Sequence, residues 1–398
     1  PGWLLGIGLL AVVAITWAAV WGLQSTVPAG VGTSLEQAQL RVETIRTGLS
    51  VGAGFGAAAA LLLALRRQQV TERTQQATEY DAGEKRVTEL YVKAADQLGS
   101  DKAPVRLAGL YALERLAQDN PVHRQSIVEV ICAYLRMPYT PPAEEHAGQD
   151  GAAPDAAEAT DTAETPNQPT RPDPREERQV RLAAQRILAR HLRPKAADGT
   201  PSPTHWNGVT LDLTEATLLD ADFAGCVLND ARFERARFSG TALFGEARFS
   251  GTGWFGRATF AGDAWFNGTM FTSGVCFNRA TFSGDAWFGE TRFTAAVLFN
   301  RVTFSGNAEF GEAMFSGNAE FGEARFSGRA GFHSAMFSGT AWFNGATFES
   351  GAILDGASVG DDSREEDVWP DGWGVDLDTR RVVRVAVEVK PEGDAEPE

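Results

Sequence analysis

The chain has 398 residues, a formal net charge of -16 and 43% hydrophobic residues. Its length accommodates two or three units with separate cores. The acidic balance argues against a strongly basic nucleic-acid-binding protein, and the wide spacing of Cys132, Cys226 and Cys276 fits neither a disulfide framework nor a zinc site.

Two uncharged runs predict a transmembrane hairpin over residues 1–66. Trp3–Leu23 has 21 residues without a charge, and about 20 apolar residues cross the hydrocarbon core of a bilayer. A secretory signal peptide is the alternative, but this run is long for one and lacks a clear cleavage site. Thr47–Leu65 is a second run, of 19 residues, in which glycines recur every four positions and allow close helix packing.

The arginines around these runs predict the orientation. Arg66, Arg67 and Arg73 follow the second run closely, whereas Arg41 and Arg46 lie in the short loop before it. The positive-inside bias then places the bulk of the chain in the cytoplasm. Only 5 of the 36 basic residues are Lys, which is typical of a GC-rich bacterial genome. We therefore expect a bacterial cell-membrane protein with two spans, for which the lipid bilayer is one partner.

Residues 67–139 predict a helical stalk followed by a pair of short amphipathic helices. Ser100 is expected to cap the first helix, and Asn120-Pro121 to begin the second, which runs to about Arg136. The pair is similar to one armadillo or HEAT-type unit, and it should dock on another element because it cannot bury both faces alone.

An acidic linker and a basic helix come next. Residues 140–173 are rich in Ala, Pro and acidic side chains, a composition that predicts disorder. Residues 174–206 predict an amphipathic helix, Pro174–Arg193, and an N-terminal cap. Such a helix either covers the end of the following repeats or lies on an anionic membrane, and the need to cover a solenoid end favours the cap.

From Val209 onward the sequence repeats. Apolar centres such as Phe223, Leu228 and Phe233 lie five residues apart, and from Phe244 the spacing alternates between six and five, usually with Ala two positions before each centre. Side chains five residues apart share no face of a helix, and the frequent Ser-Gly pairs would break one. An Ala-x-Phe triplet instead puts both side chains on one side of a short strand, so each repeat is one face of a coil.

This pattern resembles the pentapeptide-repeat family, in its Phe-Ser-Gly-rich branch. The resemblance implies that four faces make one coil, with the central residue and the preceding small residue inside. Some 27 faces over residues 207–358 would give about seven coils. The fold class predicted is therefore mainly β, a right-handed quadrilateral β-helix preceded by two transmembrane helices and a small α-helical unit. Pro1–Arg193 also resembles the amino-terminal part of a group of actinobacterial membrane proteins that carry such repeats.

Outward residues 22 apart would stack in columns along such a coil. Two columns are unusually apolar for an outer face, which predicts contact with a protein partner or a second copy of the chain. The alternative is that the Trp rings only stack on neighbouring rungs. The partner-binding candidates in these columns are Trp254, Leu298, Trp265 and Trp287.

A further column holds Arg257, Arg279 and Arg301. Stacked arginines repel unless an anion intervenes, so this column could hold an acidic segment of a partner or of the chain's own tail. The alternative is solvated side chains that fan apart. Residues 359–398 predict a C-terminal cap, in which Trp369 and Trp373 cover the last coil and a hairpin follows, and then an acidic tail.

No constellation of residues predicts catalysis, so we expect no catalytic, cofactor-binding or metal-binding residues. His146, His191 and His205 read as isolated residues of the linker or cap, and His333 as solvent-facing. The sequence predicts a non-catalytic membrane-anchored scaffold that binds an unknown protein at the cytoplasmic face. The alternative is a DNA-mimic modulator of a type II topoisomerase (gyrase), as in some soluble members of the family. That role needs a strongly acidic surface, whereas residues 207–358 carry 16 acidic and 10 basic residues.

Overall fold

The computed structural model describes residues 34–142, 173–196, 198–360 and 366–385, together with seven residues between Val13 and Ser25. Most of the first predicted span, the acidic linker from residue 143 to 172 and the tail after Val385 lie outside the described residues. The chain divides into two units, Pro1–Thr88 and Glu89–Glu398.

Helix α2 runs from Ser34 to Leu98 and contains the second predicted span, Thr47–Leu65. From Ile45 onward it is long and apolar enough to cross a membrane, and it is the one helix of the described residues that meets this test. Apolar side chains such as Leu61 and Leu62 are exposed on it, at 62% and 67%. Two spans and their orientation stay a prediction.

Three helices form the amino-terminal part of the second unit, and a single 3-10 turn, η1 (Pro121–His123), links the first two of them. They are α3 (Ala103–Asp119), α4 (Arg124–Arg136) and α5 (Pro174–Leu192). The last turns of α2 pack against α3 so closely that a Cβ on Gly109 would meet the carbonyl oxygen of Ala94.

The prediction that Ser100 caps α3 is wrong. Lys102 holds the N-cap position and makes no side-chain cap, while Pro104 lies in the first turn. Pro fits only the first turn of a helix, so it sets the start of α3 beyond Ser100. Helix α5 is capped by Asp173, which accepts a hydrogen bond from the backbone N–H of Arg175 at 2.9 Å.

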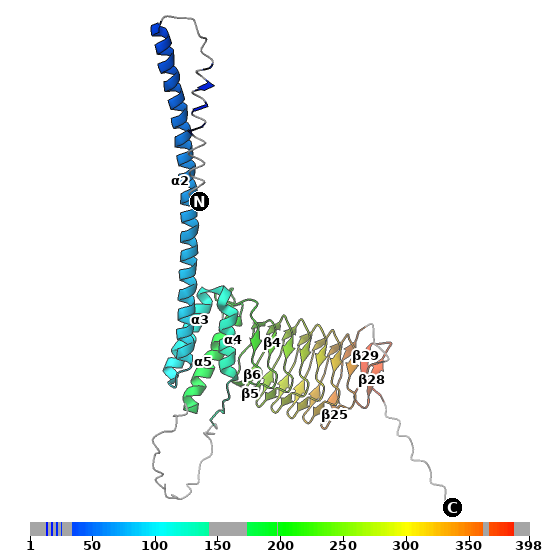
Figure 1. Cartoon of the computed structure of the whole chain (residues 1–398). Coiled ribbons are helices and arrows are strands. Elements are labelled where there is room, and N and C mark those ends of the chain that lie inside the picture. Colours follow the sequence, from blue (N-terminus) through cyan, green and yellow to red (C-terminus); the bar gives the residue numbers. More distant parts are fainter. Residues whose placement is uncertain are drawn as a thin grey trace, which may run out of the picture. The chain divides into compact units, whose positions relative to one another are not determined.

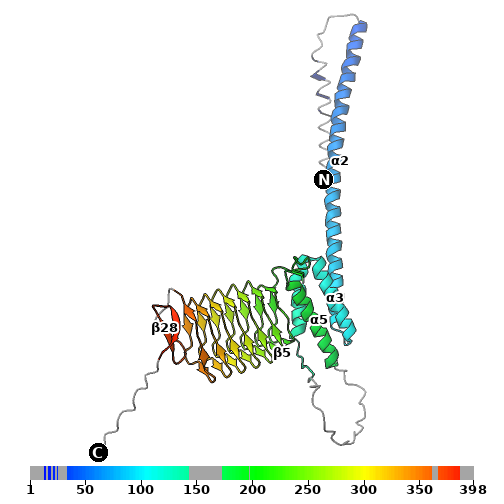
Figure 2. The same cartoon turned by 180° about the vertical axis from the view of Figure 1, so that it is seen from behind.

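Residues 211–359 form a β-solenoid of about seven turns, whose strands build four parallel sheets (Figure 1; Figure 2 gives the reverse view). Each turn visits sheets I, II, III and IV in that order. Sheet I contains β1 (Leu211–Asp212), β4 (Ala231–Arg232), β8 (Gly253–Trp254), β12 (Val275–Cys276), β16 (Val297–Leu298), β20 (Ala319–Glu320) and β24 (Ala341–Trp342). Sheet II contains β2 (Thr217–Leu219), β5 (Arg237–Ser239), β9 (Thr259–Phe260), β13 (Thr281–Phe282), β17 (Thr303–Phe304), β21 (Arg325–Phe326) and β25 (Thr347–Phe348).

The other two sheets complete each turn. Sheet III contains β6 (Ala242–Leu243), β10 (Ala264–Trp265), β14 (Ala286–Trp287), β18 (Ala308–Glu309), β22 (Ala330–Gly331) and β26 (Ala352–Ile353). Sheet IV contains β3 (Val227–Leu228), β7 (Arg248–Phe249), β11 (Met270–Phe271), β15 (Arg292–Phe293), β19 (Met314–Phe315), β23 (Met336–Phe337) and β27 (Ser358–Val359). The register is the predicted one: Ala231 pairs with Gly253 and Ala264 with Ala286, each 22 residues on.

Phenylalanine rings fill the inside of the coil. The ring of Phe288 stacks on those of Phe266 and Phe310, with centroids 4.8 Å away on each side, close to the ~4.8 Å between neighbouring strands. Rings from opposite sheets meet edge-on in the middle, as Phe288 and Phe299 do at 5.5 Å. This stack, with a small residue, usually Ala, beside each Phe, is the core of the solenoid.

Both ends of the solenoid are covered. At the amino-terminal end, α4 contacts β1 and α5 contacts β2 (Figure 1). At the other end Trp369 lies against Phe343, and a hairpin of β28 (Trp373–Asp376) and β29 (Arg381–Arg384) pairs antiparallel with β27. Covered ends prevent edge-to-edge pairing of strands, so the side walls are the surface left for contacts.

Candidate functional site

Sheet I carries an apolar column on its outer face, formed by Trp254, Cys276 and Leu298 and called column I below. Cys276 pairs with Trp254 on one side and with Leu298 on the other. Trp254 is 38% exposed, and the other two side chains are half-buried. Burial raises the pKa of the Cys276 thiol, so this cysteine stays protonated at neutral pH and serves as an apolar surface residue.

Sheet III carries the second apolar column, formed by Leu243, Trp265 and Trp287 and called column III below. The rings of Trp265 and Trp287 stack with centroids 5.3 Å apart and planes 18° from parallel. Both are half-buried. The two rings therefore cover part of each other's apolar surface. This agrees with the alternative interpretation, in which the Trp rings only stack on neighbouring rungs.

Columns I and III lie on opposite walls of the solenoid, because each turn passes sheet II between them. They cannot merge into one patch. A partner that covers one wall leaves the other free.

Arginines line the corner between sheets I and II. This basic row consists of Arg235, Arg257, Arg279 and Arg301, all with positive φ between 54° and 60°. The left-handed backbone is held by hydrogen bonds to the next turn, in which the N–H groups of Arg257 and Arg279 each donate to a carbonyl oxygen at 2.9 Å. These arginines are exposed.

The ends of the basic row are neutralised and its middle is not. Arg235 pairs with Glu215 at 2.9 Å, and Arg301 donates two hydrogen bonds of 2.9 Å to Glu323. These bonds hold the pKa of Glu323 below its ordinary value. Arg257 and Arg279 make no ion pair with any residue that the structure describes, and their neighbours in the row are cations.

A shallow depression of about 300 Å³ lies beside the basic row. It is lined by Asn278, Arg279, Asn300, Arg301, Gly322, Glu323 and Asn344. The Oδ1 atoms of Asn278 and Asn300 each accept a backbone N–H of the next turn, at 3.0 and 2.9 Å. The side-chain ladder therefore keeps the amides in fixed places along the depression.

The diagonally opposite corner, between sheets III and IV, has the opposite sign. Glu246, Glu290 and Glu312 stand there in one acidic row, also with positive φ, and all three are exposed. An anionic ligand would be attracted to one edge of the solenoid and repelled from the other.

The comparison with protein families matches this region. Residues 212–243 match pentapeptide repeats (8 copies), and residues 233–275, 266–314, 277–324 and 310–358 match pentapeptide repeats (9 copies). The solenoid is a pentapeptide-repeat domain. The predicted resemblance is thereby confirmed over residues 212–358. No curated protein and no solved structure matches the chain.

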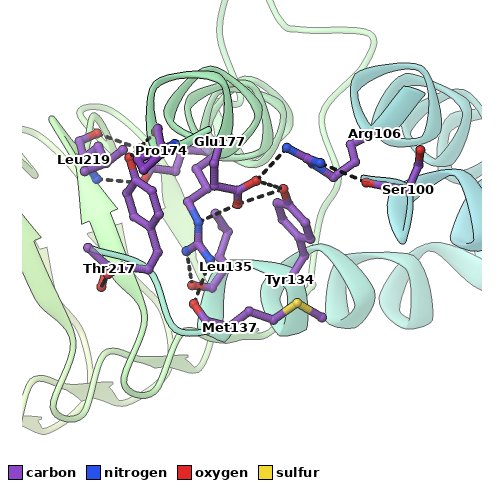
Figure 3. A network of polar contacts seen from close by, with 12 residues as sticks. Ser100, Arg106, Tyr134, Leu135, Met137, Pro174, Glu177, Thr217 and Leu219 are labelled. Atoms are coloured by element: carbon purple, nitrogen blue, oxygen red, sulfur yellow. Dashed lines mark hydrogen bonds and ion pairs between the residues drawn. The ribbon is translucent and has the colours of Figure 1, made fainter. Parts of the chain in front are cut away.

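A buried ionic network joins the helices next to the pentapeptide-repeat domain (Figure 3). Glu177 accepts hydrogen bonds from the Tyr134 hydroxyl and from Nε of Arg181, both at 2.8 Å, and lies 3.1 Å from the guanidinium of Arg106. Arg181 also donates to the carbonyl oxygens of Leu135 and Met137 at the end of α4. The pKa of Tyr134 is raised by burial and by its bond to Glu177, so the hydroxyl keeps its proton.

Within this network, Glu177 and Arg181 are four residues apart on α5, a spacing visible in the sequence, whereas their contacts with Arg106, Tyr134 and the end of α4 join residues distant in the sequence. A cavity of about 770 Å³ lies beside it. Within the described residues, no group of three or more His, Cys, Asp or Glu side chains is placed to hold a metal ion.

The prediction that His191 is isolated is wrong. Its Nε2 lies 2.7 Å from the Glu114 carboxylate and its Nδ1 lies 2.6 Å from the carbonyl oxygen of Thr204. Its ring stacks on Trp206 at 3.9 Å, and Nδ1 of His205 in turn lies 3.1 Å from the carbonyl oxygen of His191. These contacts fasten the end of α5 to α3 and to the segment that precedes the solenoid, and His333 is exposed as predicted.

The structure gathers five of the seven candidate residues on one side of the domain. Trp254 and Leu298 lie on sheet I, next to the basic row with Arg257, Arg279 and Arg301, whereas Trp265 and Trp287 lie on the opposite wall. The sequence analysis missed that Glu215 and Arg235 extend the row. Counting back by 22 and then 20 residues from Arg257 would have found both. Partner binding by any of these residues stays a prediction.

Proposed function

We propose that the chain is a non-catalytic scaffold, anchored in a bacterial membrane by α2, that offers its pentapeptide-repeat domain to a protein partner at the cytoplasmic face. Solenoids of this family typically serve in protein interaction. The observation that supports the proposal best is that one side of the domain combines the exposed Trp254 with Arg257 and Arg279, which make no ion pair within the described part of the chain. Exposed Trp and Arg side by side are the residue types that dominate binding energy at interfaces.

The basic row speaks against the DNA-mimic alternative. A mimic of DNA needs a continuous acidic surface, and here four successive rungs of one edge carry arginines. Tethering through α2 would also keep the domain away from a chromosomal enzyme.

In-cell photo-crosslinking tests the proposal. A photoreactive residue at position 279 should capture a defined protein, and Trp254→Asp in the same chain should reduce that capture while the circular dichroism of the domain stays unchanged. The matched control position is Met336, which is 46% exposed on sheet IV. Equal capture from positions 279 and 336, or capture unaffected by Trp254→Asp, would rule out this side of the domain as the interface. A reactive residue at position 265 tests column III in the same experiment.

A further inference from the structure

We infer that the basic row binds an acidic α-helix of the partner protein and that column I packs against an apolar edge of the same helix. The inference rests on the proposed function, since it names the chemistry of the partner. It commits to a helix with carboxylates three or four residues apart.

The charges along the corner favour the binding of an anion near its middle. Glu215 and Glu323 neutralise Arg235 and Arg301 at the ends of the row, whereas Arg257 and Arg279 stand next to each other at a spacing of ~4.8 Å without an ion pair to any described residue. Like charges this close repel. A ligand that brings two carboxylates to Arg257 and Arg279 relieves the repulsion and forms charge-assisted hydrogen bonds.

The depression beside the row supplies further donors. Arg279 and the amides of Asn278 and Asn344 line it, together with Glu323, whose carboxylate is hydrogen-bonded to Arg301. Carboxylate oxygens only accept hydrogen bonds, so guanidinium and amide N–H groups along one groove suit an acidic chain. The acidic row on the opposite corner would repel the same ligand, which restricts binding to this edge.

Spacing favours a helix over an extended strand. Residues three or four apart on a helix lie about 5–6 Å apart, whereas alternate residues of a strand lie about 6.8 Å apart. The rungs of the basic row repeat at ~4.8 Å, so carboxylates on one helix face match them more closely.

Each rung also offers an apolar group three residues before its arginine. Trp254 precedes Arg257, Cys276 precedes Arg279, and Leu298 precedes Arg301. A helix with an acidic stripe on the row therefore lays the neighbouring stripe on column I. An amphipathic helix provides such a pair of stripes.

Peptide titration tests the inference on the full chain in detergent. The probe is a fluorescent, helix-forming 14-residue peptide with Glu at every fourth position and Leu beside each Glu, and the reference peptide has Gln in place of Glu. We expect the Glu peptide to bind in a salt-sensitive manner and the Gln peptide to bind far more weakly. The double variant R257E/R279E should weaken binding of the Glu peptide by about tenfold or more, which is about 1.4 kcal/mol.

The matched control is R248E/R292E, which reverses two exposed arginines of sheet IV and changes the net charge equally. It should keep most of the affinity. An equal loss in both double variants, or no binding by the intact chain, overturns the inference. If R257E/R279E loses the circular dichroism signal of the solenoid, the milder variant R257Q/R279Q is used instead. Unchanged affinity of R257Q/R279Q for the Glu peptide would also contradict the inference.

The chain's own linker is a rival occupant, because Thr140–Thr170 carries seven acidic residues and no Lys or Arg. A version with these seven residues changed to Gln or Asn separates the two cases. If the Glu peptide binds only to this version, the linker occupies the basic row in the unaltered chain, and the inference is wrong. Crosslinking from position 279 can still succeed in either case, so the proposed function is judged separately.

Discussion

Individual buried phenylalanine side chains contribute strongly to the stability of the solenoid. Phe288 is fully buried, stacks between Phe266 and Phe310, and meets Phe277 and Phe299 edge-on at 5.7 and 5.5 Å. Its ring therefore contributes to three successive turns. Removal of a ring from such a stack leaves a cavity that the rigid rungs cannot close.

We expect Phe288→Ala to reduce the free energy of unfolding of the pentapeptide-repeat domain by about 3–5 kcal/mol. Denaturant unfolding followed by the far-ultraviolet circular dichroism of the strands measures this. Met336→Ala, on the outer face of sheet IV, is the control and should change stability by no more than ~0.5 kcal/mol. Unchanged unfolding of the Phe288 variant would contradict a Phe-filled coil.

Helix α5 is fastened to its neighbours by a pH-sensitive cluster. The Glu114 carboxylate lies 2.7 Å from Nε2 of His191 and 3.2 Å from the guanidinium of Arg190. The hydrogen bond with His191, aided by the charge of Arg190, lowers the pKa of Glu114 although burial opposes the shift. Both ring nitrogens of His191 lie within hydrogen-bonding distance of oxygen atoms, Nε2 near the carboxylate of Glu114 and Nδ1 near the carbonyl of Thr204.

The sign of the pH effect follows from the lowered pKa of Glu114. A carboxyl whose folded pKa is depressed stabilises the fold above its unfolded pKa of about 4.3, and this contribution is lost as the pH falls through the folded pKa. We therefore expect Glu114→Gln to be less stable than the unaltered chain at pH 7, and the difference to shrink on acidification below about pH 4.3. Melting of both chains across this range measures it, with Glu129→Gln on exposed α4 surface as the control. A difference independent of pH would exclude the charge of Glu114 as the cause.

Elements set by periodic spacing could be predicted, whereas those set by distant contacts could not. The alternating five- and six-residue spacing of Phe predicted the strand register that Ala264 and Ala286 confirm. The start of α3 was missed because Pro104 outweighs Ser100 as a boundary. The network of Glu177 and the stacking of His191 on Trp206 depend on tertiary folding. The columns were predictable from 22-residue spacing, but their position on opposite walls followed only from the order of the sheets.

At the scale of the whole molecule, covered ends and opposed edges limit how the second unit can associate. Helices α4 and α5 cover one end and the Trp369 cap covers the other, so end-to-end stacking is blocked. The basic row and the acidic row give two opposite edges of the solenoid opposite charges. A partner that recognises these charges must therefore bind to a side wall and not to an end.

Membrane anchoring is the prediction that concerns the chain as a whole. Thr47–Leu65 within α2 has 19 uncharged residues, which span about 28 Å as a helix and match the hydrocarbon core of ~30 Å. We expect a chain that starts at Arg67 to move from the membrane fraction to the soluble fraction, whereas the full chain stays in membranes through an alkaline carbonate extraction. The double variant Leu61→Arg, Leu63→Arg should weaken retention without deleting any residue, since Arg in the middle of a span costs about 2.5–3.5 kcal/mol each. Retention of the shortened chain after the extraction would place the membrane contact elsewhere, with the basic α5 as the next segment to examine.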